Sequence, residues 1–113
     1  MGLPKGVRLS RAADFARVRA EGRSYPGRYL LLNTLNAGTD GWKAGIVTPK
    51  KLGNAVARNR IRRRLRELVR AETVRFRQGQ WLVIVARWRS PQATFAEMKK
   101  DWLAVAGRAG LFA

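Results

Sequence analysis

The chain has 113 residues, and its 24 Lys and Arg against seven Asp and Glu give a formal net charge of +17, which predicts a polyanionic partner, above all nucleic acid. A hydrophobic content of 46% excludes a disordered chain, and the length predicts one domain, residues 1–113. The absence of Cys excludes disulfides and thiolate metal sites, and the absence of His removes the commonest general base and metal ligand. The acids are too scattered for a two-metal centre, so we expect no catalytic residue and no bound metal.

The N-terminal part of the chain is expected to hold a basic arm and one helix. Residues 1–9 contain Gly, Pro and cationic side chains and are assigned to the arm. Ser10 has the side chain of an N-cap, which predicts a helix that runs to about Glu21. Phe15 and Val18 lie three residues apart and should share one face of this helix.

Two strands are expected next, joined as a hairpin. A turn at residues 24–27 leads into an apolar strand over residues 28–35, which lacks clean alternation and should be covered on both faces. The turn cluster at residues 36–41 separates it from a second strand, residues 42–48. That strand ends at Pro49, which has no amide hydrogen for a sheet.

The second half of the chain is predicted to form a helix, a strand and a second helix, in that order. Asn54 should cap a long helix that ends near residues 76–79. Residues 80–86 are β-branched and nearly all apolar, which predicts a central strand. Residues 94–97 form a capping box for a last helix, followed by a tail, residues 107–113, that need not be ordered without a partner. The core stripe of that helix is expected to be Phe95, Met98, Trp102 and Val105 or Ala106.

This order of elements predicts an α+β sandwich with the helices on one side of the sheet. No apolar run approaches the ~20 residues that span a bilayer. Residues 1–6 lack the apolar core of a secretory signal. We therefore expect a cytoplasmic protein with no membrane partner and no small-molecule substrate.

The helix that begins at Asn54 keeps one face apolar and fills the rest with arginine. Apolar residues recur at helical spacing around Ile61 and Leu65, while Glu67 is the only acid within residues 50–70. An ordinary charged face mixes signs for i,i+4 pairs, whereas arginine in excess suits bidentate contacts to phosphate. The candidate RNA-binding side chains are Lys50, Lys51, Arg58, Asn59, Arg60, Arg62, Arg63, Arg66 and Arg70.

The charge of this helix alone does not separate RNA from DNA as the partner. A basic helix fits the DNA major groove, but no helix-turn-helix pair or zipper heptad accompanies it here. That favours recognition of a folded RNA by its shape. A membrane-active basic helix is a weaker alternative, because Trp and Phe are not concentrated on this helix and the strands require a folded core.

One stretch carries a resemblance to a known family. The signature of the bacterial ribonuclease P protein subunit resembles Lys50-Lys51-x-Gly53-Asn54-Ala55-Val56-x-Arg58-Asn59-Arg60-Ile61-x-Arg63-x-x-Arg66-Glu67. The similarity extends to the first helix, to the strand Trp81 to Arg87 and to the last helix, and so covers residues 8–106.

The resemblance implies that the chain assists a catalytic RNA and is not itself the catalyst. In that family a large RNA uses Mg²⁺ to cleave the 5′ leader from precursor tRNA, and both RNAs would be partners of this chain. The implied fold is an α-β-β-β-α-β-α sandwich with a mixed sheet and a left-handed βαβ crossover, against the right-handed rule. The family's leader cleft lies between the first helix and the sheet, which assigns to the leader Phe15, Arg19, Tyr29, Leu31 and Asn33.

Three positions depart from the family pattern. Arg19 and Asn33 stand where some relatives carry aromatic residues, so hydrogen bonds and charge would replace stacking there. Pro49 replaces an expected serine. For Phe15 a role in the core is an equal alternative. A structural ribosomal-RNA-binding protein of similar fold is the second functional hypothesis.

Overall fold

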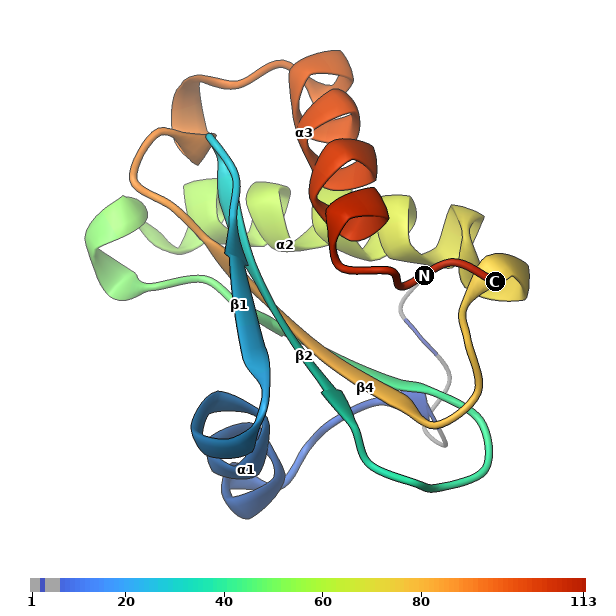
Figure 1. The fold of residues 1–113 in the computed structure, drawn as a ribbon. Coiled ribbons are helices and arrows are strands. Elements are labelled where there is room, and N and C mark those ends of the chain that lie inside the picture. The colour runs from blue at the N-terminus through green and yellow to red at the C-terminus, as the bar shows by residue number, and fades with distance from the viewer. Residues whose placement is uncertain (1–2, 4–6) are drawn as a thin grey trace.

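The computed structural model describes Leu3 and residues 7–113, and these residues form three helices and one four-stranded sheet (Figure 1). The elements are α1 (Ala12–Glu21), β1 (Arg23–Pro26), β2 (Leu30–Asn36), β3 (Lys43–Val47), α2 (Ala55–Ala71), β4 (Gln80–Ala86) and α3 (Phe95–Arg108). Short 3₁₀ turns lie between some of them, namely η2 (Lys50–Leu52), η3 (Thr73–Arg75) and η4 (Ser90–Gln92). The expected α+β class and the α-β-β-β-α-β-α order are confirmed.

The sheet has the strand order β1-β2-β4-β3, so the last strand in the chain lies in its interior. β4 pairs antiparallel with β2 and parallel with β3, which makes the sheet mixed. The predicted strand at residues 80–86 is therefore confirmed in both its bounds and its central place. Its nearly continuous apolar run is buried on both faces, as an interior strand requires.

The expected hairpin between residues 28–35 and 42–48 is wrong. β4 lies between β2 and β3, because a strand that is apolar on both faces is best buried between two neighbours. The hairpin of this sheet joins β1 and β2, where the N–H of Gly27 donates to the carbonyl of Leu30 at 2.8 Å. Residues 24–27, expected as a turn, mostly belong to β1.

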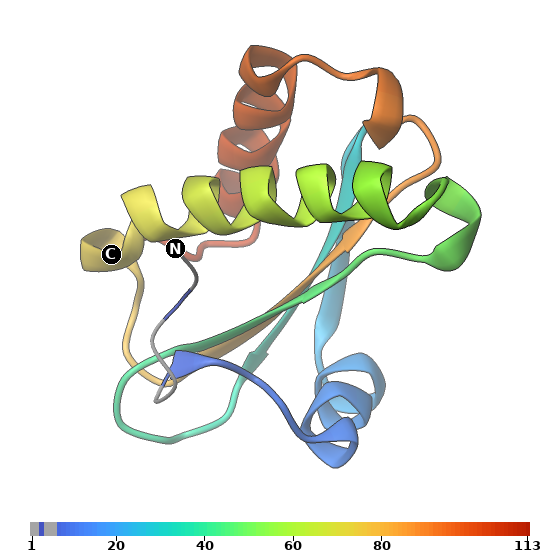
Figure 2. The same cartoon turned by 180° about the vertical axis from the view of Figure 1, so that it is seen from behind.

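The helices cover both faces of the sheet. Figure 1 shows α2 and α3 on one side and α1 on the other, and Figure 2 shows the same arrangement from behind. Successive residues of β4 therefore contact different helices. Leu82 and Ile84 join the cluster under α2 and α3, whereas Val83 packs with Val18 of α1. The expectation of helices on one side holds for α2 and α3 and is wrong for α1. The β3–α2–β4 unit is the crossover to which the expected left hand applies, and its handedness stays a prediction.

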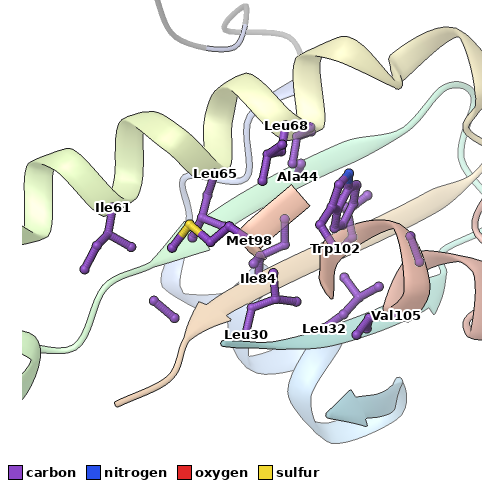
Figure 3. Packing of buried hydrophobic residues seen from close by; sticks show 14 of the residues in the cluster. Leu30, Leu32, Ala44, Ile61, Leu65, Leu68, Ile84, Met98, Trp102 and Val105 are labelled. Carbon is purple, nitrogen blue, oxygen red and sulfur yellow. The ribbon is translucent and has the colours of Figure 1, made fainter. Parts of the chain in front are cut away.

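The larger core lies between the sheet and the pair α2 and α3 (Figure 3). Ile61, Leu65 and Leu68 recur on one face of α2 and are buried, as the helical spacing predicts. They meet Met98 and Trp102 of α3, which are also buried. Burial of each such side chain stabilises the fold by roughly 1.5–3 kcal/mol. This apolar face orients α2 and leaves the other faces of the helix to its arginines.

Two predicted helix starts are confirmed. The side chain of Asn54 accepts a hydrogen bond from the N–H of Ala57 at 2.9 Å and caps α2. Thr94 and Glu97 form the reciprocal capping box of α3. The expectation that Phe95 belongs to the core stripe is wrong, because Phe95 is the first residue of the helix and is 37% exposed.

Two other helix limits differ from expectation. The N-cap of α1 is Arg11 and not Ser10, and no side chain caps that end. α2 ends at Ala71 and not near residues 76–79. The chain continues as η3, and Phe76 then turns into the core, so an apolar residue at helical spacing belongs to the next segment.

Segments near both ends of the chain contact the fold. The N–H of Leu9 donates to a carbonyl of β3 at 2.9 Å, so this residue of the expected arm lies beside that edge strand. The expectation for residues 1–2 and 4–6 lies outside the described residues. The order of segment 107–113 was left open by the sequence, and in the structure this segment packs on the fold, because Leu111 is completely buried.

Candidate nucleic-acid interface

The 17-residue helix α2 presents most of the cationic side chains predicted to bind RNA. Asn59, Arg60, Arg63 and Arg70 are exposed. Among the ion pairs within the described residues, one involves an α2 arginine, and it joins Arg70 to Glu67 at 4.0 Å. A pair at that distance between half-exposed side chains neutralises little charge. The positive potential of this face is therefore available to a polyanion.

Four arginines of α2, Arg58, Arg62, Arg64 and Arg66, are partly covered, and hydrogen bonds to the protein hold two of them. Arg62 donates to Asn59 Oδ1 at 2.7 Å and to the hydroxyl of Thr48, just after β3. Arg64 donates to the carbonyl of Ala93 at 3.0 Å. The Nε atom of Arg58 is buried without a hydrogen-bond partner. Arg62 is thus held against the segment that follows β3, and its contact with RNA stays a prediction.

Lys50 and Lys51 extend the basic face beyond the N-terminus of α2. Both lie in η2 and are exposed. Gly53 joins η2 to α2 with a φ of 143°, which side chains rarely adopt, so this glycine is required by the backbone. The amides at the start of α2 add to the positive potential beside the two lysines.

A hollow connects the arginine helix to α1. Arg62 and Arg66 line it from α2, and Phe15 lines it from α1. Gly45 of β3 forms part of its floor, and Arg8 of the N-terminal arm forms part of its rim. Arg8 was not among the candidate residues, because it lies outside any helical pattern and only the pairing of the arm with β3 brings it here.

The sheet face next to α1 has an open apolar row that crosses all four strands. Strand register places Pro26, Leu31, Val85 and Val47 side by side, in that order. None of the four is buried. We call this set the floor row. α1 covers the neighbouring rows but leaves the floor row accessible. We call this surface, between α1 and the sheet, the cleft, and the assignment of the leader to it stays a prediction.

Two of the predicted leader residues line the α1 side of this cleft. Phe15 and Arg19, one turn apart on α1, form a hollow with Val47. The ring of Phe15 also packs on Gly45, where a Cβ atom would lie 2.5 Å from the ring. Phe15 therefore packs against the sheet and also lines two hollows, and its contact with the leader stays a prediction.

The other three predicted leader residues lie apart from one another. Leu31 is in the floor row and lines a second hollow. Asn33 is on the same face, but it is only 7% exposed and its Oδ1 accepts a hydrogen bond from Ser24 at 2.5 Å. Tyr29 lies elsewhere, since its hydroxyl contacts Glu97 of α3 at 3.2 Å, so placing it in the α1 cleft was wrong. Tyr29 precedes β2, and the sheet alternation therefore does not govern its direction.

The part of the chain that the structure describes contains no group of three or more acids that could hold a metal ion. Likewise, no helix in this part is long and apolar enough to cross a membrane. The one resolved pKa shift lies outside this face. A hydrogen bond from the backbone of Thr94, and then one from its hydroxyl, lower the pKa of Glu97 below its usual value.

Comparisons with known proteins agree with this geometry. The family model described as Ribonuclease P matches residues 3–110. The chain is 35% identical over 111 residues to the ribonuclease P protein component of Syntrophomonas wolfei, covering 98% of this chain and 93% of that protein. It is 39% identical over 111 residues to the corresponding protein of Symbiobacterium thermophilum, covering 96% of each.

Solved structures show the same fold. The Staphylococcus aureus RNase P protein matches with a TM-score of 0.89 and 30% identity, covering 96% of this chain and 100% of that one. The RNase P protein of Thermotoga maritima matches with a TM-score of 0.81 and 27% identity, covering 89% of this chain and 96% of that one. With its arginine helix, mixed sheet and open sheet face, this chain belongs to the ribonuclease P protein family.

Proposed function

We propose that the chain binds the catalytic RNA of ribonuclease P through α2 and holds the 5′ leader of precursor tRNA in the cleft beside α1. It would thereby assist an RNA-based endoribonuclease that forms the mature 5′ end of tRNA in the cytoplasm. The observation that carries this proposal is the hollow that joins the two surfaces. Phe15 of the cleft and Arg62 and Arg66 of α2 line the same hollow, so one RNA surface continues into the other.

The arginine face suits a folded RNA. Guanidinium groups make bidentate contacts with phosphates, and release of counterions makes such binding strongly salt-dependent. Arg62 is already held by Asn59 and Thr48, so its side chain loses less freedom when it binds. Arg60 and Arg63 are exposed and can adapt to the phosphates that they meet.

The cleft suits a single strand. Its floor row is apolar, and Arg19 of α1 and Lys51 of η2 lie at its sides. Such a combination accepts the faces of bases on apolar and aromatic side chains and the phosphates on cations, with little demand on sequence.

The reaction chemistry would belong to the RNA subunit. Mg²⁺ held by that RNA would supply the activated water and stabilise the leaving oxygen. The residues of this chain would bind and orient the two RNAs and offset the repulsion between their phosphates. A cationic protein that does this should lower the magnesium concentration at which the RNA works.

Precursor-tRNA cleavage at low magnesium tests this proposal. Ribonuclease P RNA alone, the protein alone and both together are compared under the same salt. We expect cleavage only in the combined sample. Cleavage by the protein alone would place the active site in this chain, and no effect in the combined sample would favour a structural ribosomal-RNA-binding protein.

A further inference from the structure

The open face of the sheet has a second wall, which includes two residues, Arg87 and Trp88, that were not among the predicted site residues. Beyond the floor row, on the side away from α1, the chain leaves β4 through Arg87 and Trp88. These residues form a hollow of about 360 Å³ together with Pro49 and Lys51, which follow β3. Leu31 of the floor row lines the same hollow, so the wall adjoins the proposed leader cleft directly.

Trp88 is more exposed than the other three tryptophans of the chain. Its residue is 61% exposed, whereas Trp81 and Trp102 are buried and Trp42 is partly buried. An indole this exposed costs solvation free energy without adding to the core. With 61% of the residue exposed, the ring keeps a free apolar surface beside the contact that Arg89 makes with it.

The backbone that carries Trp88 is held on both sides. The N–H of Arg87 donates to the carbonyl of Tyr29 at 2.9 Å, and the N–H of Ser90 donates to the carbonyl of Arg87 at 2.9 Å. The side chain of Arg87 donates to the carbonyl of Gly27 at 2.8 Å. Arg89 lies over the indole, with its guanidinium carbon 4.7 Å from the ring centroid. An exposed aromatic ring on a fixed backbone is ready to bind a flat partner at little entropic cost.

The charges around Trp88 indicate which partner fits. The hollow beside Leu31 is lined by the cations Lys51 and Arg87 and by no acid. A second hollow lined by Trp88 includes the acid Glu97 besides Arg28 and Arg89. An anionic strand would therefore approach from the Leu31 side, and that side continues into the cleft.

We infer that Trp88 is a base-stacking site for the 5′ leader, beyond the nucleotides that α1 contacts. This inference rests on the proposed function. A leader that crosses the floor row would place one of its distal bases on the indole and a neighbouring phosphate beside Lys51 or Arg87. Stacking of one base on an aromatic side chain contributes about 1–3 kcal/mol, and tolerates any base.

The test measures the affinity of the reconstituted holoenzyme for precursor tRNAs whose leaders are shortened stepwise from the 5′ end. Trp88→Ala should weaken binding of the long-leader substrate by roughly 5- to 150-fold, which is the stacking contribution converted to affinity. Affinity for short-leader substrate, for mature tRNA and for the catalytic RNA should not change. Trp88→Phe, which keeps a ring, should recover most of the loss, and Val74→Ala, at a 92% exposed apolar residue of η3, should have no effect.

Other outcomes overturn the inference in distinguishable ways. Equal affinity of wild type and Trp88→Ala for every leader length would show that the ring binds no RNA. Loss of affinity for the catalytic RNA with an unchanged leader effect would assign the ring to that RNA. If the wild-type protein fails to assist cleavage at all, the proposed function fails, independently of Trp88.

Discussion

Arg62 and Arg63 are neighbours in the sequence, but they differ in exposure and in hydrogen bonding. Arg62 is held against Thr48 and Asn59, whereas Arg63 is exposed. A guanidinium group that the protein holds is preorganised for one phosphate position, whereas a free guanidinium group can adopt several conformations and contact phosphates at different positions. Both are expected to contribute positive charge to the same RNA, by different routes.

Replacing both arginines tests this face. The double variant Arg62→Ala with Arg63→Ala should bind ribonuclease P RNA more weakly, and the slope of log affinity against log salt should become shallower by about 1.5–2, because two phosphate contacts are lost. The measurement is a salt titration of RNA binding, with thermal unfolding to confirm that the variant folds.

The matched control removes two lysines from an exposed part of another helix. Lys99→Ala with Lys100→Ala on α3 lowers the net charge by the same amount. It should leave both the affinity and the salt slope close to wild type. An equal loss in the two double variants would mean that only the net charge matters, and the assignment of the α2 face would be wrong.

At the scale of the element, the start of α3 depends on a titratable cap. Glu97 accepts from the N–H of Thr94 at 2.8 Å, while its own N–H donates to the Thr94 hydroxyl at 3.1 Å. These bonds favour the charged carboxylate and lower the pKa of Glu97. The stabilisation is thus present above the pKa that Glu97 has in the unfolded chain, and is lost as the pH falls through the lower folded-state pKa.

We expect two variants of this cap to behave differently with pH. Thr94→Ala should reduce the free energy of unfolding by about 1 kcal/mol at neutral pH. Glu97→Gln keeps an acceptor for the cap but cannot titrate, so the acid-side loss of stability should be smaller than in wild type. Urea unfolding followed from neutral to acidic pH measures both. The control is Glu67→Gln on α2, and a wild-type pH profile in Glu97→Gln would contradict the role of this carboxylate.

At the scale of the whole molecule, Asp101 joins segments that are far apart in the sequence. Its carboxylate on α3 accepts hydrogen bonds from the backbone N–H groups of Arg28, Tyr29 and Leu30, at 3.0, 2.8 and 3.3 Å. Arg28 and Tyr29 lie in the turn between β1 and β2, and Leu30 is the first residue of β2. The carboxylate therefore fixes α3 onto the hairpin.

Asp101→Asn should lower the free energy of unfolding by roughly 1–3 kcal/mol, because a charged acceptor of three N–H groups is replaced by one amide oxygen. Denaturant unfolding checks this change. Asp40→Asn, in the exposed loop between β2 and β3, should change stability far less. If the two variants are equally stable, the Asp101 bonds contribute nothing beyond those that water would supply.

Much of the fold could be predicted because it depends on neighbours in the sequence. The caps at Asn54 and Thr94, the bounds of β4 and the apolar face of α2 each follow from spacings of two to four residues. Local patterns were less reliable at Ser10 and at the end of α2, where an apolar residue at helical spacing belongs to the following segment.

The candidate site was predicted less completely. The residues of the signature lie together on α2 and η2, because one continuous segment carries them. The leader residues come from separate elements, and the structure brings Phe15, Arg19 and Leu31 to the cleft while it directs Tyr29 toward α3. Trp88 had no signal in the sequence, because an exposed and a buried tryptophan look the same there.

The sequence by itself determined the polyanionic partner, the type of nearly every element and the family, since charge, periodicity and a continuous motif do not depend on distant contacts. Only the tertiary structure decided that β4 lies between β2 and β3, that α1 covers the second face, and that Arg62 bends back to Thr48. The reason is energetic. Which strands pair and which face a helix covers depend on the burial of residues far apart in the chain, and local spacing does not encode that free energy.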